Sequence, residues 1–184
     1  MCIRDSFTSG QTIYAAIGGT VEDFFDNAIS AASATFTVAD NLPPTYVFNP
    51  PDTEINVAVS SNLTITFNEA VRNINDTALT DSNVDSLITL KDTDANGSNI
   101  AFNATIDADK KIITINPTSS FSSEQEVYLA IGATVEDSSD NAITSGSSSF
   151  TAVDSNPPDV EFFPTNSSTG VAVNSDAVSY THLR

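Results

Sequence analysis

The 184-residue sequence is poor in several residue types, and each shortage narrows the chemistry open to the chain. It has one cysteine, Cys2, so it can form neither an intrachain disulfide nor a thiolate metal site. It has no tryptophan, and its single histidine, His182, lies near the end of the chain. Because residues 7–177 contain neither histidine nor cysteine, triad chemistry that depends on these side chains is excluded from that stretch.

Basic residues and long apolar runs are also scarce. Six Lys and Arg against 24 Asp and Glu give a formal net charge of −18. Such a charge repels nucleic-acid phosphates and anionic lipid surfaces, and it favours cations as partners. No apolar run approaches the roughly 18 residues that a membrane-spanning helix needs. We therefore expect neither nucleic-acid binding nor membrane insertion in this segment.

The two ends differ in character from the rest of the chain. Residues 1–6 and 178–184 resemble translated sequencing-adapter sequence, and we expect both strings to be foreign to the protein. The alternative is a pair of natural termini, which would be poorly ordered in either case. Residues 1–6 lack the apolar core of a signal peptide, so we expect any export signal to lie outside this segment.

The strongest feature that is present is an internal repeat. Residues 13–23 recur as residues 127–137, so that Tyr14 becomes Tyr128, an offset of 114 residues. The same offset holds without a gap from Phe7 to Asn62, and roughly half of the aligned positions in that range are identical. A repeat of this length is about one domain, so it indicates a tandem array.

Two Pro-Pro pairs mark the boundaries of the repeat, because proline interrupts regular structure. They are Pro43-Pro44 and Pro157-Pro158. We predict one complete copy at residues 43–156, the C-terminal part of an earlier copy at 7–42, and the N-terminal part of a later copy at 157–177.

Within the complete copy, apolar and polar residues alternate over short stretches. Leu63, Ile65 and Phe67 fall on one face of a predicted strand, and Thr64 and Thr66 fall on the other. Further strands are expected at 46–48, 57–59, 87–90, 100–106, 111–115, 126–131 and 148–153. This spacing predicts an all-β fold, an antiparallel immunoglobulin-like (Ig-like) β-sandwich.

These residues resemble those of the bacterial Ig-like domains found in surface-layer proteins and large bacterial adhesins. The resemblance rests on the opening Pro-Pro, on residues 57–59 leading into residues 63–71, and on the Tyr128 strand followed by residues 137–142. It departs from the family at Asp140, where glycine is usual. The resemblance implies a spacer or adhesive module of a secreted or cell-surface protein, whose partners are the neighbouring repeats, and it implies no activity.

Acidic and amide side chains gather in one predicted loop of the repeat and suggest a calcium site, because calcium takes six to eight oxygen ligands. The loop residues are Glu136, Asp137, Asp140 and Asn141, and their repeat equivalents are Glu22, Asp23, Asp26 and Asn27. Glu69, in a predicted turn, and the linker residues Asp40, Asp154 and Asp159 would complete such a site at a domain junction. The alternative is that these residues form turns or cap a short helical turn.

Two smaller motifs are interpreted as structural. Residues 92–97 resemble the start of a calcium-binding EF-hand loop, but the twelfth position is Asn103 and strands flank the segment, so a β-turn is expected. Tyr14 and Tyr128 begin strands at a place where Ig-like sandwiches often bond a tyrosine hydroxyl to the backbone.

The sequence therefore leaves three classes of function open. The leading expectation is a structural spacer or adhesive module that is stiffened by calcium. The alternatives are a module that binds a surface glycan or protein, for which the Phe24-Phe25 pair is the nearest candidate, and an accessory domain of a large secreted hydrolase. A paired-carboxylate glycosidase is not excluded by composition, but no tryptophan is available as a sugar platform, and we expect the segment not to be an enzyme.

Overall fold

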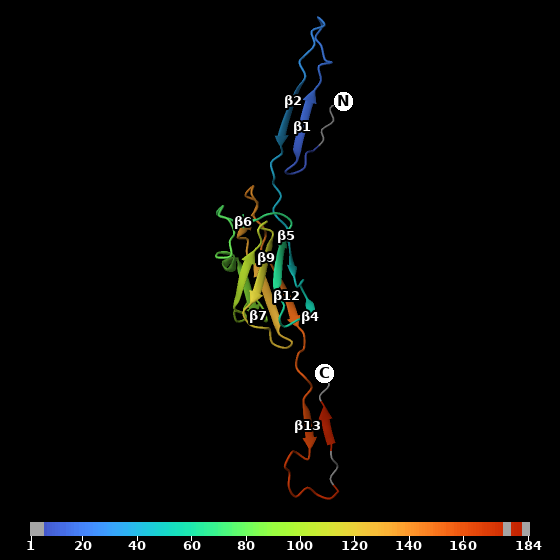
Figure 1. Cartoon of the computed structure of the whole chain (residues 1–184), viewed down its shortest axis with the longest axis vertical. Helices are drawn as coiled ribbons and strands as arrows, with labels where there is room; N and C mark the ends of the chain where they lie inside the picture. Colours follow the sequence, from blue (N-terminus) through green and yellow to red (C-terminus); the bar gives the residue numbers. More distant parts are fainter. Residues whose placement is uncertain (1–5, 175–177, 182–184) are drawn as a thin grey trace.

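The computed structural model describes residues 6–174 and 178–181, which form an elongated molecule (Figure 1). A compact module occupies the middle of the long axis, and a two-stranded hairpin projects from each end. The described secondary structure consists of strands, apart from one short 3-10 helix, η1 (Val84–Leu87). None of the described segments is a helix long and apolar enough to cross a membrane.

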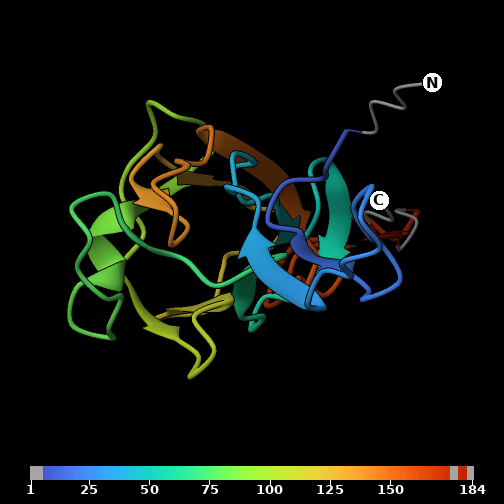
Figure 2. The same cartoon turned by 90° about the horizontal axis from the view of Figure 1, so that it is seen from above.

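The central module contains two four-stranded sheets. The first has the order β4 (Glu54–Val57), β12 (Gly146–Ala152), β10 (Glu126–Ile131) and β7 (Ile88–Asp92). The second has the order β3 (Tyr46–Asn49), β5 (Leu63–Phe67), β9 (Ile112–Pro117) and β8 (Phe102–Ile106). Neighbouring strands are antiparallel except β4, which runs parallel to β12. Viewed along the long axis, β12 and β8 lie on opposite sides of the module (Figure 2).

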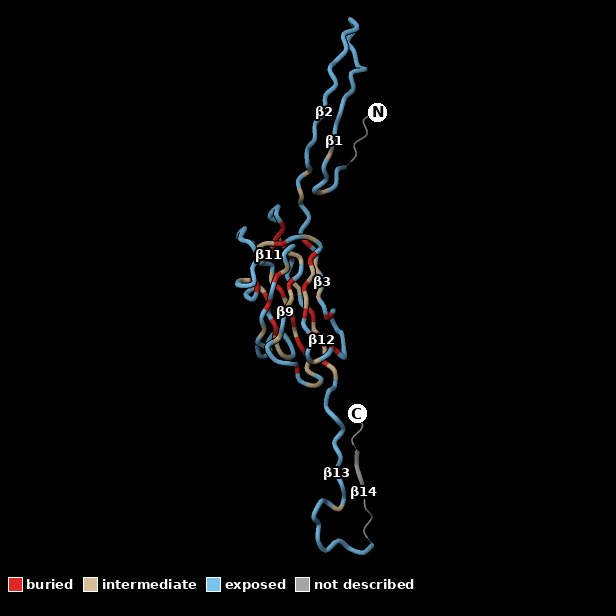
Figure 3. The backbone as a smooth tube through the Cα atoms, viewed as in Figure 1, coloured by how far each residue is buried: buried red, intermediate tan, exposed pale blue. Residues whose placement is uncertain are grey.

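The core lies between these two sheets, as the period-two alternation predicts. Leu63, Ile65 and Phe67 of β5 are buried, and so are Ile113 and Ile115 of the adjacent β9. Burial of each such side chain stabilises the fold by about 1.5–3 kcal/mol. The buried residues are confined to the central module in Figure 3, apart from the Pro-Pro segment at its entry. The predicted antiparallel sandwich is therefore confirmed for this part of the chain.

One predicted strand is misplaced by the sequence argument. The strand expected at residues 57–59 is observed as Glu54–Val57, and Val57 is the only residue common to both ranges. The Val57-Ala58-Val59 segment is apolar because Val57 lies in the core and Val59 packs against it. Val59 lies beyond the end of the strand, where its backbone carbonyl accepts a hydrogen bond from the N–H of Phe121 (2.8 Å). The remaining predicted strands are found with shifts of about two residues at their ends, the usual uncertainty of such boundaries.

The two structural motifs have different outcomes. Residues 92–97 form the predicted turn, in which the N–H of Gly97 donates to the carbonyl of Asp94 (3.0 Å), and a Cβ at Gly97 would collide with the backbone of Asp92. For Tyr14 and Tyr128 the structural role remains a prediction. A hydroxyl that does bond the backbone is that of Tyr46, which donates to the carbonyl of Thr144 (2.8 Å) and joins β3 to the segment before β12.

An acidic segment covers the outer edge of β8. The N–H of Ala104 donates to Oδ1 of Asp85 (2.6 Å), and the N–H of Ile106 donates to Oδ1 of Asp81 (2.9 Å). Exposed edge strands are templates for unwanted pairing, and side chains that occupy their free amides remove that hazard. The segment around η1 therefore closes one side of the second sheet.

The end hairpins are exposed and lack a second layer. Strand β1 (Thr12–Ile17) pairs with β2 (Ala32–Thr37), and β13 (Val160–Phe163) pairs with β14 (Val178–Thr181). Strand β14 lies within the string that the sequence marks as foreign, and residues 1–5 and 182–184 of the two strings lie outside the described residues. An isolated hairpin is marginally stable in water.

Candidate cation sites at the entry end of the module

The loop between β10 and β12 is organised by the carboxylate of Asp137. Its Oδ1 accepts the N–H groups of Ser139 (2.7 Å) and Asn141 (3.0 Å), and its Oδ2 accepts Nδ2 of Asn141 (2.8 Å). Asp137 is only 1% exposed. Burial acts to raise its pKa, but the hydrogen bonds from Asn141 and Ser139 and the charge of Arg72 outweigh burial, so the pKa is lowered. The turn-forming alternative is therefore the one observed at Asp137.

The equivalent loop near the start of the chain repeats this arrangement. Oδ1 of Asp23 accepts the N–H groups of Phe25 (2.8 Å) and Asn27 (2.9 Å), and the side chain of Asn27 bonds the same carboxylate. These hydrogen bonds, with that of the Asn27 side chain first, lower the pKa of Asp23.

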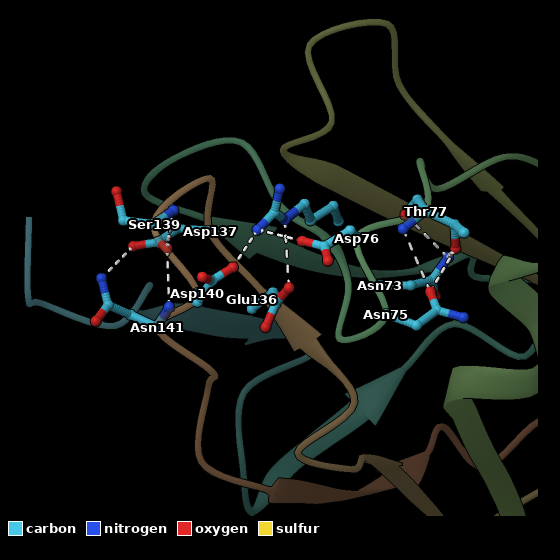
Figure 4. Close-up of polar contacts among 10 residues, drawn as sticks. Asn73, Asn75, Asp76, Thr77, Glu136, Asp137, Ser139, Asp140 and Asn141 are labelled. Carbon is cyan, nitrogen blue, oxygen red and sulfur yellow. Dashed lines mark hydrogen bonds and ion pairs between the residues drawn. The ribbon is translucent and has the colours of Figure 1, made fainter.

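Two further residues of the predicted site face an arginine instead of an open cavity. The guanidinium of Arg72, on β6 (Arg72–Asn73), lies 3.3 Å from Oε1 of Glu136 on β11 (Val135–Glu136), and it also pairs with Asp140. It reaches Asp76 at 2.6 Å. Figure 4 shows Asp76, Glu136 and Asp140 gathered at this end of the module. A cation of the protein itself therefore already offsets part of the negative charge of this acidic group.

Asp140 has a left-handed backbone conformation, with φ of 67°. Glycine adopts this conformation without cost, and Asp and Asn are the other residues that tolerate it best. The loop thus keeps the backbone form that a glycine would take, and the side chain gained in exchange reaches Arg72.

A second group of carboxylates joins the linker to the module. One carboxylate oxygen from each of Asp40, Glu69 and Asp137 lies within 4.8 Å of the other two. Nδ2 of Asn141 also donates to the backbone carbonyl of Asp40 (3.3 Å), so the linker contacts the loop directly. The sequence argument named all three carboxylates, and the structure brings them together at the point where the chain enters the sandwich.

The electrostatics of this junction are unfavourable without a counter-charge. Burial raises the pKa of Glu69, and the negative charges of Asp137 and Asp40 raise it further, while Asn68 and Lys111 act in the opposite direction. A bound cation would relieve the same repulsion. The donor set consists of carboxylate oxygens, which suits a hard divalent cation, although three carboxylates supply only part of a calcium coordination shell.

Asp154 belongs to a different place. It follows β12 and its Oδ1 accepts a hydrogen bond from Oγ of Ser123 (2.8 Å), as Oδ1 of Asp40 accepts one from Ser9 (2.7 Å). Figure 1 shows the chain leaving the module at the end opposite to its entry. Asp154 therefore stands at the exit, as the counterpart of Asp40 at the entry.

Sequence reasoning missed Arg72 and Asp76. A usable signal was present, because Arg72 is the single arginine between Arg4 and Arg184 in a strongly acidic chain. Such an isolated cation is expected to have carboxylate neighbours. Its partners could not be named from sequence, since Asp140 lies 68 positions away along the chain.

A separate aromatic pair lies at the tip of the N-terminal hairpin. Phe24 is 95% exposed and Phe25 is 79% exposed, and their rings are perpendicular with centroids 5.6 Å apart. The residues 114 positions later are Ser138 and Ser139, and both are exposed. The phenylalanines and these serines are therefore both presented to solvent.

The arrangement of strands, loop and linker can now be compared with known proteins. The bacterial Ig-like domain family matches residues 40–152, which is more than half of the chain. The chain belongs to this family. Bacterial Ig-like domains are generally not catalytic, and the site described above is made of turn-forming and charge-pairing groups.

A solved structure that resembles the chain is CopC from Methylosinus trichosporium OB3b. The two are 16% identical in sequence and align with a TM-score of 0.41, over 62% of this chain and 97% of that one. No curated protein matches the bacterial Ig-like chain in sequence.

Proposed function

We propose that this chain is part of an extracellular or cell-surface array of bacterial Ig-like modules, in which it acts as a structural spacer or adhesive stalk. In this proposal residues 43–156 are one complete module, residues 7–42 end the preceding module, and residues 157–177 begin the next. The partners of each module are its neighbours in the same chain, since repeat arrays are held by nearest-neighbour contacts.

The observation that carries this proposal is the path of the chain. It enters the central module at one end and leaves at the other (Figure 1), which supports an arrangement of successive modules along one axis. The formal charge of −18 supports the same role, because like charges along an array oppose its collapse and aggregation.

We further propose that a divalent cation, with calcium as the candidate, stiffens the entry junction through Asp40, Glu69 and Asp137. The support is the close approach of these carboxylates from the linker, the β5 turn and the loop. Of the other residues named from the sequence, Asn141 bonds both the linker and Asp137, and Glu136 and Asp140 act through Arg72. Asp154 would serve the next junction.

Thermal unfolding of the whole chain tests the cation proposal. The melting temperature is measured in EDTA, in millimolar calcium and in millimolar magnesium. Glu69→Gln is the site variant, and Glu126→Gln is the control, because Glu126 is exposed and lies at the end of β10 away from the loop. A cation that is present at a free concentration of about 100 times its Kd stabilises the native state by about 2.7 kcal/mol, which raises the unfolding midpoint by several degrees. Calcium should act on the control and not on the site variant. An unchanged midpoint for the parent chain would leave the carboxylates as turn-formers.

Small-angle X-ray scattering of the whole chain tests the spacer role. We expect a maximum dimension that matches the extended arrangement of Figure 1 and that does not shorten when salt is raised to 0.5 M, about the range where charge repulsion is screened. A compact particle, with the hairpins folded onto the central module, would contradict the proposal.

A module that binds a surface glycan or protein is a second candidate, and the exposed Phe24-Phe25 pair favours it. Exposed aromatics on a loop tip are typical recognition elements. The test is binding of the whole chain to immobilised glycans and host-surface proteins, compared with the Phe24→Ser/Phe25→Ser variant, which carries the serines of the complete copy. Equal binding by the two chains would remove this candidate.

A further inference from the structure

A hollow of about 380 Å³ lies on the outer face of the first sheet of the central module. It involves the start of β10, the end of β12 and the loops beside β4 and β7, and its lining residues are Thr53, Thr93, Glu126, Ser149, Phe150 and Thr151. All of them belong to the central module, so the two end hairpins contribute nothing to the hollow.

The strand register gathers polar side chains in this hollow. Val127 of β10 and Phe150 of β12 are buried in the core, so the residues on either side of each point away from it. Glu126 lies opposite Thr151 in the antiparallel pair, and Ser149 precedes Thr151 on the same face. Cross-strand neighbours of this kind lie about 5 Å apart, so one small ligand can reach several of these side chains.

Two loop threonines stand on opposite sides of the hollow. The N–H of Thr53, before β4, donates to the carbonyl of Ser149 (2.7 Å), and the N–H of Thr93, after β7, donates to the carbonyl of Glu126 (2.9 Å). Strands β4 and β7 flank the β12–β10 pair from its two sides, so these hydrogen bonds fix one threonine at each side.

Both threonines have a left-handed backbone conformation, with φ of 65° for Thr53 and 67° for Thr93. This conformation is an outlier for a β-branched residue, and glycine or asparagine would adopt it with less strain. Strained residues of this kind recur at ligand-binding sites, where the surrounding structure holds them in place. The two hydroxyls are therefore kept at the hollow in spite of an unfavourable backbone.

The polar side chains of the hollow take no part in holding the fold. Within residues 6–174 and 178–181, no hydrogen bond or ion pair involves the four hydroxyls or the carboxylate that line it. The adjacent Ser148 differs, because it is buried and its hydroxyl donates to the carbonyl of Pro50 (3.0 Å). The hydrogen-bonding groups of the hollow are therefore available to a ligand.

We propose that this hollow binds a neutral sugar, as one pyranose ring of a glycan with adjacent hydroxyl groups. Serine and threonine hydroxyls both donate and accept, as sugar hydroxyls do, and a carboxylate can accept from two sugar hydroxyls at once. The volume lies in the lower part of the range for small-ligand sites, about 300–1,000 Å³, which suits a single ring. The protein groups are the hydroxyls of Thr53, Thr93, Ser149 and Thr151 and the carboxylate of Glu126.

The charge of the hollow selects against other ligands. The carboxylate of Glu126 and the net charge of −18 disfavour sugars that carry a carboxylate, sulfate or phosphate group. A single carboxylate is also a poor site for a hard divalent cation, which takes six to eight oxygens and favours several charged ligands. A neutral polar ligand is the class that remains.

The inference goes beyond the proposed spacer role and does not depend on a cation at the entry junction. It gives the glycan-binding candidate a place on the central module that is separate from the Phe24-Phe25 pair.

Amide NMR spectra of the isotope-labelled whole chain test the inference. The chain is titrated in EDTA with the methyl glycosides of mannose, galactose and glucose, and with glucuronate as the charged probe. At least one neutral glycoside should shift the amide signals of Thr53, Thr93 and Thr151, with a Kd on the order of 1 mM because one ring offers few atoms. Glucuronate should leave these signals in place. The inference is wrong if none of the three neutral glycosides moves them at about 20 mM, well above that Kd.

Variants separate a lost contact from a lost fold. Glu126→Gln and Ser149→Ala/Thr151→Ala should each weaken binding by about tenfold, the effect of losing a hydrogen bond to the ligand. Thr53→Gly removes a hydroxyl and relieves the strained backbone, so it should weaken binding while the melting temperature stays the same or rises. Thr89→Ala is the matched control, because Thr89 is exposed on the outer face of the same sheet, opposite Ala130, and does not line the hollow. It should bind like the parent chain.

The other outcomes also decide the matter. If Thr53→Gly and Glu126→Gln bind as the parent chain does, the sugar binds elsewhere and the inference is wrong. It is also wrong if glucuronate binds as tightly as the neutral glycosides. Glu69→Gln should keep sugar binding, and Glu126→Gln should keep the response to calcium, so failure of this inference and failure of the cation proposal are distinguished. A cooperative melt without sugar binding leaves the proposed spacer role standing.

Discussion

At the entry end of the sandwich, one arginine holds carboxylates that come from separate parts of the chain. Arg72 contacts Asp76, Glu136 and Asp140, and Glu136 is only 5% exposed. Removing one partner of a buried ion pair is costly because it strands the other charge in a poorly solvated position. The contribution of Arg72 to stability therefore depends on the burial of Glu136 more than on the number of its ion pairs.

Replacement of Arg72 should reveal this dependence. Arg72→Met should lower the free energy of unfolding by about 2–3 kcal/mol, because Glu136 remains buried without a counter-charge. The double variant Arg72→Met/Glu136→Gln should recover most of the loss. The measurement is urea unfolding followed by circular dichroism, since the chain has no tryptophan. A double variant no more stable than Arg72→Met alone would contradict the assignment.

The carboxylate of Asp137 accepts the hydrogen bonds that hold its loop in place. Asp137→Ala should destabilise the module by about 2 kcal/mol, because the N–H groups of Ser139 and Asn141 lose their partner. Asp137→Asn keeps an acceptor at the Oδ1 position and should cost less. Ser138→Ala, at an exposed neighbouring position, is the control and should have little effect. Equal stability of Asp137→Ala and the control in urea would show that the loop does not need this cap.

At the scale of elements, the edge strands differ in whether their free backbone amides are covered. The free amides of β8 are occupied by Asp81 and Asp85, whereas β1 and β2 form a two-stranded sheet with open edges. The composition and the alternation of apolar residues predict the strands themselves. They do not predict which strand lies at an edge, because that depends on the order of strands in space.

The acidic cover of β8 can be tested by its removal. Asp81→Ala/Asp85→Ala should lower the free energy of unfolding by about 1 kcal/mol for each lost hydrogen bond. It should also increase aggregation on heating, because the amides of Ala104 and Ile106 become available to other chains. Light scattering during a temperature ramp reports the second effect. Asp81→Asn/Asp85→Asn, which keeps the acceptors, should stay close to the parent chain, and equal aggregation by both double variants would contradict the proposed cover.

At the scale of the whole molecule, identical residues at equivalent repeat positions have different surroundings. Ile131 on β10 is 2% exposed beneath the second sheet, and Ile17 on β1 is 46% exposed at the end of the chain. Local sequence treats the two positions alike. The difference arises because the central module supplies the facing sheet, and the N-terminal hairpin has none within the described residues.

This difference gives a paired prediction. Ile131→Ala should cost about 3 kcal/mol, since it removes buried methyl groups and leaves a cavity. Ile17→Ala should change the main unfolding transition by less than about 0.5 kcal/mol, since the side chain is already half in water. Both are measured by urea unfolding of the whole chain. A large effect of Ile17→Ala would mean that the hairpin is covered in solution.

The sequence by itself determined the strand content, the alternation that builds the core and the 114-residue offset, because these depend on composition, local periodicity and register along the chain. It also identified Asp40, Glu69 and Asp137 as members of one candidate site. Only the tertiary structure decided that Glu136 and Asp140 face Arg72, that the Tyr46 hydroxyl bonds the backbone of Thr144, and that β4 ends where a strand was expected to begin. These features depend on which distant segments meet across the sandwich, and a single sequence does not encode that proximity in any local pattern.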